Sequence, residues 1–159
     1  MEIKKFEIEF VKRTKDLLLG YEGPWDMSNL INCTLGLIIL PYEATRESPP
    51  PFWETELPNL PFRLEIFDPI QSIKNSKIKY YPKTLAVLLQ KIRNGLAHQN
   101  IEPVNENGKF AGIIIRNYFG LTKSHLDLKI HFSQQELKKF ALFIANEYLK
   151  NRTSEISSQ

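Results

Sequence analysis

Hydrophobic residues recur with helical spacing in four stretches of the chain. In the first stretch, about residues 2 to 20, we expect the core face to consist of Ile3, Phe6, Phe10 and Leu17. A second helix is predicted from about Asp26 to Leu40. We expect it to stop at Pro41, because proline removes a backbone donor and its ring clashes with the preceding turn.

The third stretch, from about Lys83 to His98, has the clearest amphipathic pattern. Its predicted core face consists of Leu85, Leu88, Leu89, Ile92 and Leu96. The fourth helix begins at Ser133, the first residue of a capping box in which serine and Glu136 each satisfy a free backbone N–H. The polar segment 153–159 is expected to be a frayed tail.

Between the third and fourth helices the hydrophobic period changes from helical to alternating. Asn107-Gly108 is a strong turn signal between two extended segments. Further on, apolar residues from Leu126 to Phe132 alternate with Asp127, Lys129 and His131, which should face solvent. We predict a small antiparallel sheet before the last helix, with a short first strand near residues 101–104.

Residues 41–82 contain eight of the ten prolines, so long regular structure is not expected there. The same segment is too apolar for a disordered linker. We predict an ordered, Pro-rich excursion packed on the helices, with a short helix near Ile70 to Lys77. The alternative is a flap that faces a substrate. Together, residues 1–152 should form a single, mainly α domain.

Composition narrows the class of protein. The chain has 159 residues, is 42% hydrophobic and carries a net charge of +3, which suits one core and permits contact with phosphates. The single cysteine, Cys33, excludes an intramolecular disulfide and is expected to be a small buried hydrophobe. Neither a signal peptide nor a membrane span is apparent, so we expect a cytoplasmic protein that does not contact a membrane.

Several kinds of site are not indicated. Three histidines and one cysteine without close carboxylate pairing make a structural zinc site improbable, and no cofactor is implied. Gly108-Lys109 lacks the spacing of a phosphate-binding loop. Trp25 and Trp53 are expected to be core or loop anchors rather than base-stacking platforms.

The third helix carries a second, polar stripe opposite its core face. Asn94 and His98 lie at about 180° and 220° from Leu85 around the helix, and the stripe also contains Val87 and Lys91. Arg93 lies at the flank of the core face, from which its long side chain can reach the stripe. Gly95 and Ala97 are small, which would let a ligand or another helix approach closely.

These groups suit phosphodiester cleavage without a metal ion. A neutral imidazole, here His98, can take a proton from a ribose 2′-hydroxyl. The Arg93 guanidinium can stabilise charge that develops on the phosphate, and the Asn94 amide can orient either group. Lys91 and Gln99 are candidate substrate-binding residues. The alternative is that Arg93 and His98 only stabilise the helix C-terminus and that Asn94 is a solvated polar residue.

Arg93-Asn94-x3-His98 at the end of a helix resembles the signature of the HEPN superfamily, and the hairpin, strand and final helix are similar to a plasmid-borne subfamily. The resemblance implies an up-and-down helical bundle that dimerises through the motif helices, so that two motifs form one ribonuclease site. Some toxin members carry a tyrosine two residues after the histidine, which a partner enzyme modifies. Asn100 stands there in this chain, which argues against that form of regulation.

Two functional hypotheses follow. In the first, the chain is a homodimeric, metal-independent endoribonuclease that acts on RNA, a toxin or anti-phage effector with an antitoxin or other neutralising protein as partner. In the second, it is an inactive HEPN domain that binds RNA, a nucleotide or a protein. The intact motif favours activity.

Overall fold

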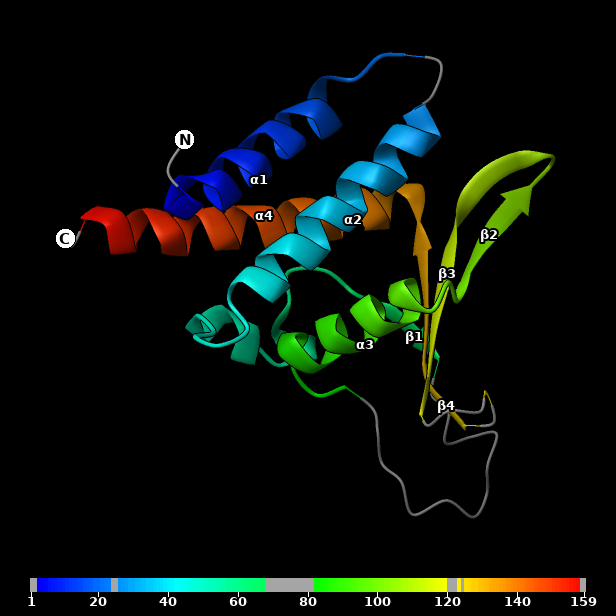
Figure 1. The fold of residues 1–159 in the computed structure, drawn as a ribbon. Coiled ribbons are helices and arrows are strands. Elements are labelled where there is room, and N and C mark those ends of the chain that lie inside the picture. The colour runs from blue at the N-terminus through cyan, green and yellow to red at the C-terminus, as the bar shows by residue number, and fades with distance from the viewer. Residues whose placement is uncertain (1–2, 24–25, 68–81, 120–122, 124, 158–159) are drawn as a thin grey trace. The chain divides into compact units, whose positions relative to one another are not determined.

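The chain is mainly helical with a small antiparallel sheet, as predicted. The computed structural model describes residues 3–23, 26–67, 82–119, 123 and 125–157. The elements in chain order are α1 (Ile3–Gly20), α2 (Asp26–Ala44), η1 (Pro51–Glu54), η2 (Leu57–Asn59), β1 (Glu65–Phe67), α3 (Leu85–Ala97), β2 (Ile101–Glu106), β3 (Lys109–Phe119), β4 (His125–Ser133) and α4 (Gln134–Ser157) (Figure 1). In the described part of the chain, no helix is both long and apolar enough to span a lipid bilayer.

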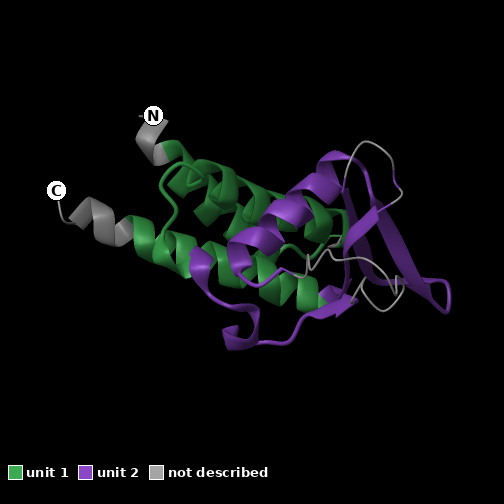
Figure 2. Ribbon diagram, turned by 90° about the horizontal axis from the view of Figure 1, so that it is seen from below, with its two compact units in different colours: residues 1–52, 135–159 green, residues 53–134 purple. Residues whose placement is uncertain are grey.

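The chain divides into two compact units (Figure 2). Unit 1 comprises Met1–Phe52 and Gln135–Gln159, and so holds α1, α2 and nearly all of α4. Unit 2 comprises Trp53–Gln134 and holds α3 and the whole sheet. Each unit is described separately below.

In unit 1, α1 packs against α2, and polar contacts join α1 to α4. The Tyr148 hydroxyl of α4 donates to Glu7 Oε2 at 3.4 Å, and Arg152 Nη2 lies 3.9 Å from the same carboxylate oxygen. Burial raises the pKa of Tyr148. Cys33 of α2 is buried, as predicted, and burial raises the pKa of its thiol.

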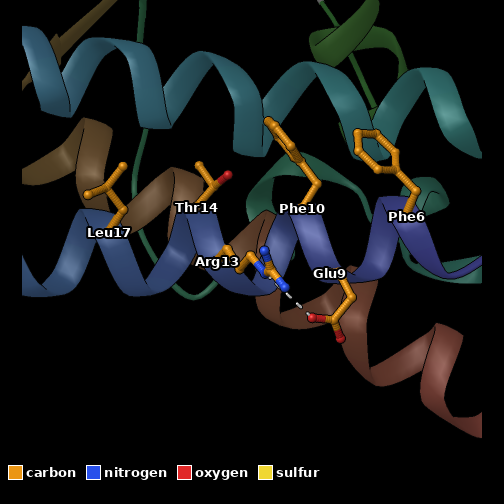
Figure 3. A pocket seen from close by; sticks show the side chains of 6 residues that line it. All are labelled: Phe6, Glu9, Phe10, Arg13, Thr14 and Leu17. Carbon is orange, nitrogen blue, oxygen red and sulfur yellow. Dashed lines mark ion pairs between the residues drawn. The ribbon is translucent and has the colours of Figure 1, made fainter. Parts of the chain in front are cut away.

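The predicted core face of α1 is wrong. Its buried residues are Ile8, Val11 and Leu18, whereas Phe6, Phe10 and Leu17 are each more than a third exposed. Figure 3 shows these three side chains on one side of α1 with Thr14, beside the Glu9–Arg13 ion pair, where they line a groove. The helix carries two apolar stripes roughly 120° apart, and spacing alone does not say which one is buried.

Two helices run past their predicted ends. The helix α2 continues through Pro41 to Ala44, because an internal proline forfeits one backbone hydrogen bond without stopping the next turn. In that turn, the Thr45 hydroxyl donates to Pro41 O at 2.7 Å. The helix α4 begins directly after Ser133, as predicted, but its backbone extends to Ser157, into the segment predicted as a frayed tail.

In unit 2, the sheet has the strand order β1-β4-β3-β2 with every neighbouring pair antiparallel. The predicted Asn107-Gly108 turn joins β2 to β3, with φ of 52° and 76° at its two residues. Only β1 was not predicted. It is three residues long, and it pairs with β4 from Glu65↔His131 to Phe67↔Lys129. His131, expected to be a solvated surface residue, therefore lies 2.6 Å from the Glu65 carboxylate.

The expected alternation of β4 breaks at Asp127. Tyr118 of β3 pairs with Leu126, but Asn117 pairs with Leu128, so Asp127 is an extra residue in the ladder. Such a β-bulge shifts the side-chain alternation. Asp127, predicted to face solvent, is therefore buried at 9% exposure next to the fully buried Leu128.

Part of the Pro-rich segment is tied to the start of α3. Its backbone pairs with the start of that helix: the Leu57 N–H donates to Lys83 O at 3.0 Å, and the Leu85 N–H donates to Thr55 O at 2.9 Å. Trp53 is buried, as expected of a core anchor. The helix expected near Ile70 to Lys77 and the position of Trp25 lie outside the described residues.

Two adjacent leucines test the corrected core face of α1. Leu18 is 4% exposed and Leu17 is 51% exposed, so the same substitution probes both stripes. We expect Leu18→Ala to lower the free energy of unfolding by about 2–5 kcal/mol. Leu17→Ala should change it by less than about 0.5 kcal/mol. Urea unfolding measures both. A larger loss for Leu17→Ala than for Leu18→Ala would show that the face first predicted, which includes Leu17, is the buried one.

Candidate active site

The helix α3 is anchored at its first turn and amphipathic along its length. Thr84 is its N-cap, and its side chain accepts from the Val87 N–H. The predicted core residues Leu85, Leu88, Leu89 and Ile92 are fully buried, and Leu96 is half-buried. Val87 is 39% exposed, on the opposite side. The predicted core face of α3 is therefore confirmed, whereas the predicted second stripe is exposed at Val87 and His98 but not at Lys91.

Gly95 brings the α3 backbone against β3. A Cβ at this position would meet the Arg116 carbonyl oxygen and the Ile115 side chain at distances that real Cβ atoms do not show. The small residue therefore admits a strand of the same chain, where the sequence suggested a ligand or another helix. This close approach fixes the distance between the motif helix and the sheet.

Backbone N–H groups satisfy three carbonyls in the last turn of α3, those of Asn94, Gly95 and Leu96. The Asn100 N–H donates to Gly95 O at 2.8 Å, and the Gln99 N–H donates to Leu96 O at 3.0 Å, which is the Schellman pattern. Asn100 O then accepts from the Arg116 N–H at 3.0 Å, so the helix end is tied to β3. Gln99 has φ of 56°, a left-handed conformation that glycine usually adopts and that costs a glutamine about 1–2 kcal/mol.

The three motif side chains surround this helix end. Arg93 and Asn94 are half-buried and contact each other, since Arg93 Nη1 donates to Asn94 Oδ1 at 3.0 Å. His98 is the C-cap residue and its side chain is exposed, as is that of Gln99. In the part of the chain that the structure describes, the His98 imidazole has no hydrogen-bond or ion-pair partner. The structure thus brings Arg93 and Asn94 together through a hydrogen bond. The His98 side chain, four residues after Asn94, is exposed to solvent.

Lys91 does not share this exposure, contrary to the predicted stripe. It is 8% exposed, and its Nζ lies 2.7 Å from Asp127 Oδ2. The bulge in β4 is the physical reason, because it turns a carboxylate inward toward α3. Asn117 of β3 completes the group by donating from Nδ2 to Asp127 Oδ1 at 2.7 Å.

Sequence reasoning missed Asp127 and Asn117. One signal was available for Asn117, since it continues the inward alternation of Ile113 and Ile115 and so is a polar residue at a core position. For Asp127 there was none, because the alternation of β4 placed it outside.

The alternative role for Arg93 and His98, stabilising the helix C-terminus, has little support in the geometry. The carbonyls of Asn94, Gly95 and Leu96 already accept backbone N–H groups of His98, Asn100 and Gln99. The His98 imidazole is not needed for this purpose, and a guanidinium donor of Arg93 is directed to Asn94. Among the described residues, no three His, Cys, Asp or Glu side chains lie close enough together to hold a metal ion.

Comparison with known proteins gives one family. A family model described as HEPN pEK499 p136 matches residues 1–155, nearly the whole chain. No curated protein and no solved structure matches significantly.

A methyl group at position 95 tests the close approach of α3 to β3. We expect Gly95→Ala to lower the free energy of unfolding by about 1–3 kcal/mol, because the strand backbone leaves no room for it. Gly20→Ala is the matched control, since a Cβ there meets nothing within 4 Å and should change stability by less than about 0.5 kcal/mol. Thermal melting of both variants is the measurement. Equal melting temperatures would show that α3 and β3 are not held so closely.

Proposed function

The chain belongs to the HEPN family described as pEK499 p136, and on that premise we propose that it is a metal-independent endoribonuclease. HEPN domains are often ribonucleases. The observation that carries the proposal is the state of the motif: Arg93 and Asn94 are bonded to each other at 3.0 Å, and His98 is exposed at the helix end. The proposal includes the up-and-down bundle and the composite site between two copies that the family implies.

The proposed reaction is an in-line attack within the RNA. His98 takes the proton of a ribose 2′-hydroxyl, whose oxygen then bonds to the adjacent phosphorus. The bond from phosphorus to the 5′-oxygen breaks, and that oxygen leaves with a proton. The products are a 2′,3′-cyclic phosphate and a 5′-hydroxyl. Across a two-fold axis, the two copies of His98 supply one base and one acid.

The remaining polar groups bind and orient the phosphate. The Arg93 guanidinium donates to non-bridging oxygens, where charge develops in the transition state. Asn94 holds one of its donors and so limits its rotation. The exposed Gln99 amide is the proposed second contact with the substrate. A toxin or anti-phage role, with a neutralising partner protein, belongs to the same proposal.

Substitution of the catalytic pair tests the reaction. We expect His98→Ala to lower the cleavage rate about 10²–10⁴-fold by removing the proton-transfer group. Arg93→Ala should lower it about 10²–10³-fold by removing charge stabilisation. Because both act in one transition state, the double variant should be little slower than the slower single one. Cleavage of labelled RNA and thermal melting are measured on the same preparations, with EDTA present.

The matched controls are His125→Ala and Arg13→Ala, which remove the same side chains from exposed positions outside α3. Both controls should cleave like the wild type, and all variants should melt near the wild-type temperature. If both motif variants keep wild-type cleavage, the chain is a binding domain rather than a nuclease. If cleavage is lost in EDTA and returns when a divalent ion is added, the reaction requires a metal ion and the metal-free mechanism is wrong.

A charge on the exposed stripe of α3 tests the dimer. A two-fold interface uses the same patch twice, so Val87→Glu would place two carboxylates near each other. We expect this variant to be monomeric by light scattering and to lose cleavage while keeping its melting temperature. Leu17→Glu puts the same charge on the exposed stripe of α1 and should leave the dimer intact. If Leu17→Glu is monomeric and Val87→Glu is dimeric, the interface lies on α1 instead of α3. A wild-type chain that is monomeric at micromolar concentration would exclude the dimer.

A further inference from the structure

Three buried polar side chains connect the motif helix to two strands of the sheet. Lys91 of α3, Asn117 of β3 and Asp127 of β4 are 8%, 6% and 9% exposed. Both oxygens of the Asp127 carboxylate are used, one by Lys91 Nζ and the other by Asn117 Nδ2, each at 2.7 Å. We call these residues the Lys91 network.

The Lys91 network provides little net stability but much directional constraint. The cost of removing two charges from water largely offsets their attraction, and apolar side chains of similar volume often serve as well. The core face of α3 consists of aliphatic side chains, whose attraction to the sheet is not directional. The 2.7 Å hydrogen bond from Lys91 Nζ of α3 is directional, in contrast, and it ends on a carboxylate that Asn117 of β3 holds in place, so it limits the rotation of α3 about its axis.

A bulge in β4 places the Asp127 carboxylate on the side of the sheet that faces α3. Without the bulge, alternation would place Asp127 on the other face of the sheet from α3. The bulge interrupts regular pairing, and it brings in an acidic residue that a purely apolar core would not need. The bulge in β4 therefore supplies the buried Lys91 with a charged partner.

Along α3, the fixed points alternate with the motif residues. Lys91 is held by Asp127, Gly95 lies against the Arg116 carbonyl, and Asn100 is bonded to the Arg116 N–H. Arg93 and Asn94 lie between the first two of these points, and His98 lies between the last two. A rotation of α3 would therefore displace all three motif side chains together.

We propose that Lys91, Asn117 and Asp127 are positioning residues of the nuclease, which set the rotation of α3 and so the placement of Arg93, Asn94 and His98. Lys91 then acts through the sheet and does not contact the RNA. This inference rests on the proposed function where it is tested by RNA cleavage. Its test by amide hydrogen exchange does not depend on that function.

The kinetic test separates positioning from folding and from substrate contact. Lys91→Met alone should lower the melting temperature, because it leaves a buried carboxylate unpaired. The triple variant Lys91→Met/Asn117→Leu/Asp127→Leu should recover the wild-type melting temperature, since its apolar side chains need no partners. Its kcat should nevertheless fall about 10²-fold, as expected of a small misplacement of catalytic groups, with little change in KM.

Two other kinetic outcomes overturn the inference. Recovery of kcat together with the melting temperature would show that the network serves folding alone. A Lys91→Met variant with raised KM, unchanged kcat and a weaker dependence of KM on salt would show that Lys91 binds phosphate directly. Asp127→Glu keeps the charge and shifts it by one methylene, so it gives the same kcat test if the triple variant does not fold.

Amide hydrogen exchange supplies a readout that needs no cleavage. In the triple variant, exchange at Gln99 and Asn100 should accelerate at least about tenfold, because their hydrogen bonds depend on the position of α3, while amides of α1 stay unchanged. If the wild type does not cleave RNA but this acceleration is seen, the proposed function fails and the positioning role stands. Unchanged exchange with wild-type kcat refutes the positioning role and leaves the nuclease intact.

Discussion

At Gly95, the backbone of α3 approaches the Arg116 carbonyl of β3 so closely that no side-chain carbon fits between them. Helices usually rest on sheets through their side chains, which allow small adjustments of distance and rotation. Here the contact involves the helix backbone itself, so the separation of helix and strand is set at this point. Within unit 2, the network at Lys91 and the tie at Asn100 both depend on that separation, because each joins α3 or its end to a strand through short hydrogen bonds.

The elements that sequence predicted well are those with strong local signals. The period of α3 identified its core residues because one apolar stripe faced one polar stripe, and Asn107-Gly108 fixed the hairpin because few other sequences favour two positive φ angles. In α1 the same procedure failed. The helix has two apolar stripes, and the choice between Phe6 and Ile8 depends on tertiary packing. The strand β1 was missed because three residues carry no measurable period.

The candidate site was predicted in part for a related reason. The motif side chains belong to one helix, so their spacing in sequence is also their spacing in space. Lys91 satisfied the same spacing rule and was assigned to the exposed stripe, yet it is buried. What decided its position was a carboxylate more than thirty residues further along the chain, brought inward by a bulge that no alternation rule foresees. Partners from distant elements are outside the reach of a periodicity argument.

The end of α3 shows how one helix can contribute both to the core and to the candidate site. A helix terminus exposes carbonyls that need donors, and side chains near it are commonly used for that purpose. In this chain backbone N–H groups of His98, Gln99 and Asn100 donate to three of these carbonyls, and the Asn100–Arg116 tie holds the helix end to β3. In that arrangement Gln99 has a φ of 56°, which is unfavourable for a residue with a side chain. Glycine would adopt this φ without strain, but it would offer no amide side chain. The imidazole of His98 and the amide of Gln99 are thereby left exposed at a helix end that backbone hydrogen bonds hold to β3, and groups held in place in this way are what the proposed proton transfer from a ribose 2′-hydroxyl would require.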